Sequence, residues 1–167
     1  MGDGSRKPQQ GTQTALSEAV ADATSIAILG CGSTLRGDDA AGSVIAERLA
    51  SLESPASRLK AFPGYSAPEN LTGEIKQYNP DLVLVIDAVD MGMRPGDTRL
   101  IPLEDVGGIS FSTHMLPLPI LMDYLHRETG CRVVLLGIQV SSLEFMAEMT
   151  PDVAQTVDDL TVELNRV

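Results

Sequence analysis

Residues 82–87 read LVLVID, an unbroken run of Leu, Val and Ile that ends on an aspartate. A strand with one face in water alternates apolar and polar residues, whereas a strand covered on both faces is apolar throughout. The run therefore predicts a strand in the middle of a parallel sheet. Residues 132–138, RVVLLGI, and residues 26–29, IAIL, predict two further buried strands in the same way.

The rest of the chain alternates between strands and helices. Residues 58–62 predict a weaker strand, and residues 98–103 predict a strand that is expected to run antiparallel. Helices are predicted over residues 15–23, 41–49, 71–78, 118–128 and 153–164. This alternation predicts an α/β fold, a single-domain three-layer sandwich with about five mostly parallel strands and helices on both faces.

The length of 167 residues fits one domain with a sizeable core. Residues 1–24 are predicted to form a flexible polar tail, over residues 1–13, followed by a short leading helix. Residues 25–167 are predicted to be the functional domain. The cysteines, Cys31 and Cys131, each stand beside an apolar run and are expected to be buried, reduced thiols.

The formal net charge of −11 bears on possible partners. A strongly acidic chain repels nucleic-acid phosphates and anionic lipid surfaces, so neither nucleic acid nor a membrane is an expected partner. The N-terminal residues lack the continuous apolar segment of a signal peptide, which predicts a cytoplasmic protein. At this size a monomer is expected.

Residues 30–42, GCGSTLRGDDAAG, form a glycine-rich turn between a predicted strand and a predicted helix. A dinucleotide fingerprint requires glycine where Leu35 stands, and no Gly-Lys-Ser/Thr follows to make a phosphate-binding loop. The pair Asp38–Asp39 would also repel a phosphate at the start of the helix. The glycines instead predict a sharp backbone turn that brings Asp39 to the edge of the sheet.

Three polar side chains are expected at this edge. Asp39 follows the first strand, Asp87 ends the LVLVID run, and His114 ends the loop before a helix. Ligands of open α/β sheets bind beyond the carboxyl ends of the strands, where these residues would meet. Two carboxylates and an imidazole suit a divalent transition-metal ion, and three protein ligands leave positions open for water or substrate.

Each of these residues also has a structural interpretation. Asp38 or Asp39 would cap the following helix. Asp87 would be an Asx-turn residue at the end of its strand. His114 would be a hydrogen-bonded structural histidine, and His126, within a helical segment, a solvated or capping one.

The motifs LGCGSTLRGDDAAG, GYSAPEN, LVIDAVDMGMRPGD, STHMLPL and LLGIQ occur in this order between residues 26 and 152. Together they resemble the family of maturation endopeptidases of nickel–iron hydrogenases, in particular its hydrogenase 3 or formate-hydrogenlyase-type branch. The resemblance implies that the metal ligands and catalytic residues are Asp39, Asp87 and His114. It also implies an α/β sheet flanked by helices.

The chain departs from the family pattern in two places. Pro63 stands where family members often carry an acidic residue, so a neighbour such as Glu69 is the candidate substitute for that acid. An N-terminal extension of about 24 residues lies outside the pattern and supports no functional assignment.

The resemblance implies one endoproteolytic cut near the C-terminus of a hydrogenase large-subunit precursor, made after nickel insertion and activating the hydrogenase. Nickel would be presented by the precursor to an exposed pocket, where another divalent ion such as zinc can substitute. Met91, Met93 and Met115, near the predicted site, are expected to contact the precursor.

The sequence leaves two catalytic mechanisms and three functions open. A bound ion would polarise the scissile carbonyl and lower the pKa of an attacking water, or Asp39 or Asp87 would act as general base, as in an aspartic-type peptidase. A non-catalytic α/β module that binds a small ligand or a metal fits the fold equally well. The third candidate function is that of a metal-dependent peptidase that acts on unrelated peptides.

Overall fold

The computed structural model describes residues 10–111 and 116–167, and its centre is a six-stranded sheet. Five strands lie in the order β2-β1-β3-β6-β4, and the sixth, β5, pairs with β3. Neighbours in the series β2, β1, β3, β6 are parallel, whereas β4 runs antiparallel to β6 at the edge. The strands are β1 (Ile26–Cys31), β2 (Leu59–Tyr65), β3 (Leu82–Asp90), β4 (Thr98–Pro102), β5 (Ser110–Phe111) and β6 (Arg132–Gln139).

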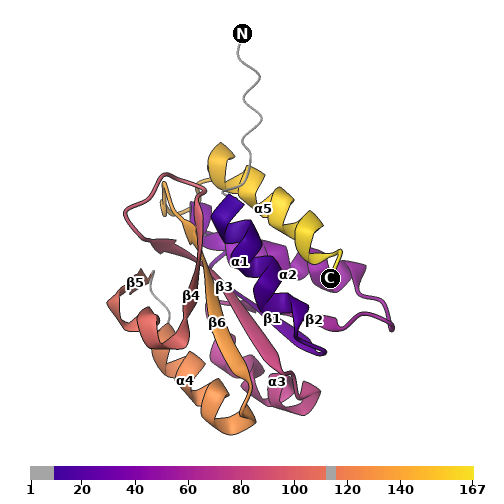
Figure 1. Cartoon of the computed structure of the whole chain (residues 1–167). Coiled ribbons are helices and arrows are strands. Elements are labelled where there is room, and N and C mark those ends of the chain that lie inside the picture. Colours follow the sequence, from indigo (N-terminus) through magenta and orange to yellow (C-terminus); the bar gives the residue numbers. More distant parts are fainter. Residues whose placement is uncertain (1–9, 112–115) are drawn as a thin grey trace.

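Helices cover both faces of the sheet, so the predicted three-layer fold is confirmed (Figure 1). One core lies beneath α1, α2 and α5, and the other beneath α3 and α4. These helices are α1 (Gln10–Ala21), α2 (Ala41–Leu52), α3 (Thr72–Tyr78), α4 (Leu118–Thr129) and α5 (Pro151–Leu164). In the described part of the chain, no helix combines the length and apolar character that crossing a bilayer would need.

Several predicted bounds need correction. The leading helix begins at Gln10, so residues 10–13 are helical although the sequence predicts a flexible tail there. Strand β3 continues to Asp90, three residues beyond its predicted end, because β5 and β6 both pair with its last residues. The two-residue strand β5 lies in a segment predicted to be a loop. The antiparallel orientation of β4 is confirmed.

The start of α2 lies directly on the backbone of the sheet. A Cβ atom on Gly42 would come within 2.1 Å of the Ile86 carbonyl oxygen and 2.6 Å of the Cys31 carbonyl oxygen. Only glycine permits this approach. It places the preceding turn, the 3-10 helix η1 (Gly37–Ala40), beside the end of β1 and against β3, which continues past this level.

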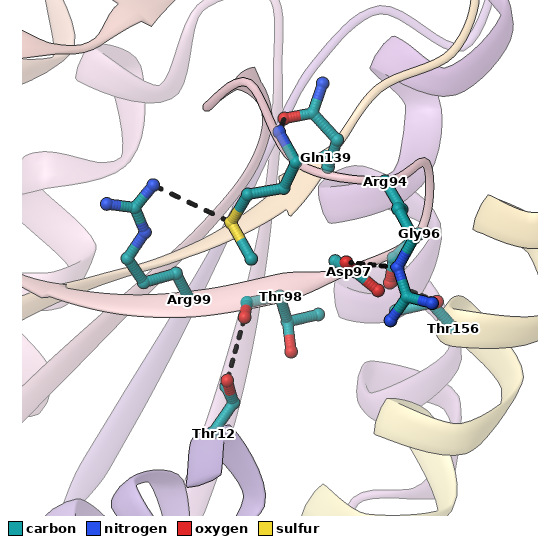
Figure 2. A network of polar contacts seen from close by, with 9 residues as sticks. Thr12, Arg94, Gly96, Asp97, Thr98, Arg99, Gln139 and Thr156 are labelled. Carbon is teal, nitrogen blue, oxygen red and sulfur yellow. Dashed lines mark hydrogen bonds and ion pairs between the residues drawn. The ribbon is translucent and has the colours of Figure 1, made fainter. Parts of the chain in front are cut away.

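The connection between β3 and β4, together with the first residue of β4, is tied to three other elements (Figure 2). Gly96 donates its N–H to the Gln139 carbonyl of β6, 2.9 Å away, and accepts a hydrogen bond of 2.7 Å from the Thr156 hydroxyl of α5. Thr12 of α1 donates to the carbonyl of Thr98, 2.8 Å away. The leading helix is therefore attached to the sheet.

Candidate functional site

Asp87 and Cys31 lie side by side on one face of the sheet. Gly30 is paired with Ile86, which puts the next residues, Cys31 and Asp87, at the same level of neighbouring strands. Along both strands the even-numbered residues point into the core beneath α1, α2 and α5, and the odd-numbered ones into the core beneath α3 and α4. Cys31 and Asp87 therefore lie on the face covered by α3 and α4. The Asp87 side chain is 0% exposed. It therefore lies within β3, where β1 ends.

Asp39 reaches the same place from η1. Gly32 adopts a φ of 122°, and a Cβ there would come within 1.6 Å of the Asp39 carbonyl oxygen. The turn thus depends on glycine at this position. The Asp39 carboxylate accepts a hydrogen bond of 2.8 Å from the Ser33 N–H, which fixes its orientation. Since α2 has Ala40 as its N-cap and no side-chain cap, the capping interpretation of Asp38 and Asp39 is wrong.

The pKa of the Cys31 thiol is affected by the charges around it. Burial raises its pKa well above the ordinary value, and the negative charges of Asp87, Asp39 and Glu69 raise it further, in that order. The geometry agrees for the two aspartates, because Asp39 packs against Gly32 and Asp87 lies level with Cys31. A thiol whose pKa is raised stays protonated at neutral pH, so Cys31 is a poor nucleophile. Both cysteines are buried and unbridged, as predicted.

Glu69 comes from the 3-10 helix η2 (Pro68–Leu71), which follows β2 and contacts the ends of both β1 and β2. Its Oε2 atom is buried and has no hydrogen-bond partner among residues 10–111 and 116–167. A buried carboxylate oxygen without a partner is costly, and such atoms occur at functional sites. Glu69 is therefore a third carboxylate close to the end of β1. The sequence suggested Glu69 only as a substitute for the acid that is missing at Pro63.

The prediction that the two aspartates line an exposed pocket is wrong. Asp39 is only 5% exposed, and Asp87 is fully enclosed. The physical reason is that β3 does not stop at Asp87, so the carboxylate is surrounded by strands and by η1 rather than standing at a free strand end. The Asx turn proposed for Asp87 is formed by Asp90, whose Oδ1 accepts a hydrogen bond of 3.1 Å from Gly92 N–H. That bond lowers the pKa of Asp90.

Gln139, the last residue of the LLGIQ motif, holds the end of β3. Its Oε1 accepts hydrogen bonds from the N–H groups of Met91, 2.7 Å away, and Met93, 3.2 Å away. Its Nε2 donates to Asp90 Oδ1 at 3.1 Å and to the Val140 carbonyl at 3.0 Å. This buried amide therefore fixes the backbone just beyond Asp90, the last residue of β3. The sequence analysis assigned it no role.

His114 and Met115 lie outside the described residues. Within residues 10–111 and 116–167, no three His, Cys, Asp or Glu side chains are grouped so that they could hold a metal ion. His126 is exposed, and its Nδ1 donates to the Cys131 carbonyl at 2.7 Å, so it is a structural residue at the end of α4.

Comparisons with known proteins identify the chain further. The HycI family model, described as hydrogenase maturation protease, matches residues 44–166, a range that holds Asp87 and His114 and begins after Asp39. The hydrogenase 3 maturation protease of Escherichia coli strain K12 is 36% identical over 132 residues, which cover 78% of this chain and 83% of that protein.

Solved structures share the fold. The crystal structure of the NiFe hydrogenase maturation protease HycI from Thermococcus kodakarensis KOD1 matches with a TM-score of 0.82 and 32% identity, covering 91% of this chain and 97% of that one. The solution structure of the endopeptidase HycI from Escherichia coli matches with a TM-score of 0.74 and 33% identity, covering 85% and 90%. The class of protein is therefore an α/β peptidase. The chain belongs to the hydrogenase maturation protease family.

Proposed function

We propose that this chain is the endopeptidase that removes the C-terminal extension of a nickel–iron hydrogenase large-subunit precursor after nickel insertion, and so activates the hydrogenase. The observation that carries the proposal is the placement of Asp39 against Gly32, directly after β1, and of Asp87 level with Cys31, the last residue of β1, in a chain of this family. Family membership disfavours the non-catalytic module.

Nickel carried by the precursor is bound by Asp39, Asp87 and His114. Strand β5 supports the inclusion of His114, because Phe111 pairs with Val89, two residues beyond Asp87. His114 follows Phe111 by three residues, a length of chain that spans at most about 10 Å. This length of chain allows the imidazole of His114 to reach the two carboxylates. Zinc, with the same preference for nitrogen and oxygen ligands, can take the place of nickel.

Burial of the carboxylates fits a protein that tests its substrate for nickel. Bringing an ion to Asp87 requires movement of the groups that enclose it, and part of the binding free energy is spent on that movement. The free enzyme is thus expected to bind nickel weakly, whereas a docked precursor supplies additional contacts. A site that stays empty until docking can distinguish a loaded precursor from an empty one.

Water is the proposed nucleophile. Asp39, oriented by its hydrogen bond from Ser33, accepts a proton from the water as its oxygen attacks the scissile carbonyl, and the proton then passes to the departing amine. Asp39, Asp87 and His114 would hold the precursor's ion beside the carbonyl, which the ion would polarise, and Asp39 would take the proton on the carboxylate oxygen that does not contact the ion. Glu69 takes the place of the acid that Pro63 replaces and contacts the precursor next to the cleaved bond. The reaction takes place in the cytoplasm and is carried out by a monomer.

The test is to incubate the purified protein with nickel-loaded and nickel-free precursor and to follow loss of the C-terminal peptide by mass spectrometry. We expect cleavage of the loaded precursor only. Equal cleavage of both forms contradicts nickel recognition, and an uncut loaded precursor contradicts the proposed reaction. Cleavage of short unrelated peptides at a similar rate identifies a general peptidase instead.

A further inference from the structure

Three exposed apolar residues lie in two contacting segments, the turn after β1 and the loop after β6. Leu35, in the glycine-rich turn, is 52% exposed, and Phe145 and Met146, in the loop after β6, are 66% and 70% exposed. The Met146 N–H donates to the Leu35 carbonyl at 2.7 Å, so the two segments are in contact. We call Leu35, Phe145 and Met146 the edge patch.

The loop that carries Phe145 and Met146 is held in one conformation. Asp38 donates its N–H to the Ser142 carbonyl at 3.0 Å, and its carboxylate accepts hydrogen bonds from three backbone N–H groups of the same loop. Met146 has a φ of 61°, a left-handed conformation that is unfavourable for a residue with a side chain. Such strain persists where the surrounding structure imposes it, frequently at functional sites. The apolar side chains are therefore presented by a fixed backbone.

We propose that the edge patch is the docking surface for an apolar segment of the hydrogenase large-subunit precursor, an inference that rests on the proposed function. The patch is continuous with the candidate site, because Leu35 and Asp39 belong to the same short turn and the Asp39 N–H donates to the Arg36 carbonyl at 3.0 Å. A segment seated on the patch therefore lies beside the turn that carries Asp39.

The charges around the edge patch indicate which kind of precursor segment binds there. Glu144 and Glu148, on either side of Phe145 and Met146, are exposed, and the whole chain carries a net charge of −11. Two exposed carboxylates against one exposed guanidinium, that of Arg36 beside Leu35, favour basic side chains in the partner and raise its rate of association. The expected occupant is an apolar segment flanked by Lys or Arg.

A second copy of this chain is a poorer occupant. A stable protein–protein interface takes about 20–30 residues a side, many more than this patch offers. Two copies would also bring their own acidic loops together, which like charges oppose. A substrate that docks transiently requires only a small contact with an aromatic anchor such as Phe145.

The test measures cleavage and binding of the nickel-loaded precursor separately. Phe145→Ser and Leu35→Ser are compared with the wild type and with Val162→Ser, which removes a 52% exposed apolar side chain from the last turns of α5. We expect each edge-patch variant to raise KM and to weaken precursor binding about tenfold, with kcat within about twofold of wild type. Val162→Ser and all melting temperatures should match the wild type.

The outcomes separate the two proposals. If the wild type does not cut the precursor but Phe145→Ser still weakens its binding, the proposed reaction is wrong and the docking surface stands. If Phe145→Ser and Leu35→Ser bind and cut like the wild type, the docking surface is wrong. A change of oligomeric state in these variants, seen by analytical ultracentrifugation, overturns the precursor as occupant in favour of a second copy.

Discussion

The carboxylate of Asp38 binds both the N–H and the hydroxyl group of Thr150, 112 residues further along the chain, with Oδ1 at 2.7 Å and 2.8 Å. Its Oδ2 accepts hydrogen bonds of 2.8 Å and 3.0 Å from the N–H groups of Ser141 and Ser142. The neighbouring Asp39 lies at the candidate site instead. The adjacent aspartates therefore have different tasks, one joining two loops and the other serving the site.

Asp38→Asn should lower the free energy of unfolding by about 3 kcal/mol, because an amide cannot accept all of these hydrogen bonds and its own N–H groups would face other donors. Urea unfolding measures the change. Hydrogen exchange of the Ser141 and Ser142 amides should become faster in the variant. A loss of less than about 0.5 kcal/mol, the range of ordinary surface substitutions, would show that Asp38 does not hold the loop.

Cys31→Ala should leave cleavage of the nickel-loaded precursor within about threefold of wild type, because the raised pKa keeps the thiol protonated and water is the nucleophile. The variant loses a small buried group and is expected to be about 1 kcal/mol less stable. The measurement is the initial rate of peptide release below the melting temperature. Complete loss of cleavage in a folded variant would assign Cys31 a direct chemical role.

Glu69→Gln should slow cleavage at least about tenfold, since it removes the charge of a carboxylate whose Oε2 is buried beside the candidate site. Glu74→Gln, at an exposed position on α3, removes the same charge and is the matched control. Steady-state rates with the nickel-loaded precursor measure both. If the two variants behave alike, Glu69 has no special part in the reaction.

Asp81 gives a pH-dependent contribution to stability. Its pKa is lowered chiefly by the hydrogen bond from Thr24 N–H at 2.8 Å, with Ser25 N–H also donating at 3.1 Å. The folded state therefore favours the carboxylate, and the stabilisation is present above the ordinary pKa of 3.8 and is lost as pH falls through the lower folded value.

Asp81→Asn should accordingly destabilise the protein at pH 7, by up to about 1 kcal/mol because the site is exposed. The difference from wild type should shrink as the pH falls below 3.8, where Asp81 of the unfolded chain becomes protonated, and should vanish below the lower folded value. Urea unfolding at pH 7 and at pH values near 3 compares the two proteins. A difference that stays constant or grows in acid contradicts this assignment.

The sequence predicts the fold well where a long pattern determines it. The continuous apolar runs of β3 and β6 indicate central parallel strands because only burial on both faces favours such runs. Strand β5 has two residues and no periodicity, so it cannot be recognised. Without it, the residues after Asp87 look like the start of a turn, which is why the burial of Asp87 was not predicted.

The candidate site is predicted in part. That Asp39 and Asp87 share an edge follows from the rule that parallel strands end together. The role of Asp38 depends on partners more than a hundred residues away, which no local pattern reveals. Phe145 and Met146 are apolar and look like core residues, and only the structure shows them exposed.

The most direct measurement of the central claim is the rate at which Asp39→Asn cuts the nickel-loaded precursor. The substitution keeps the size of the side chain and removes its charge, and Asp105→Asn, at an exposed position, is the control for charge alone. We predict that folded Asp39→Asn is at least about a hundredfold slower than wild type, while Asp105→Asn is unaffected. A folded Asp39→Asn variant that cuts the precursor within about twofold of the wild-type rate contradicts the account.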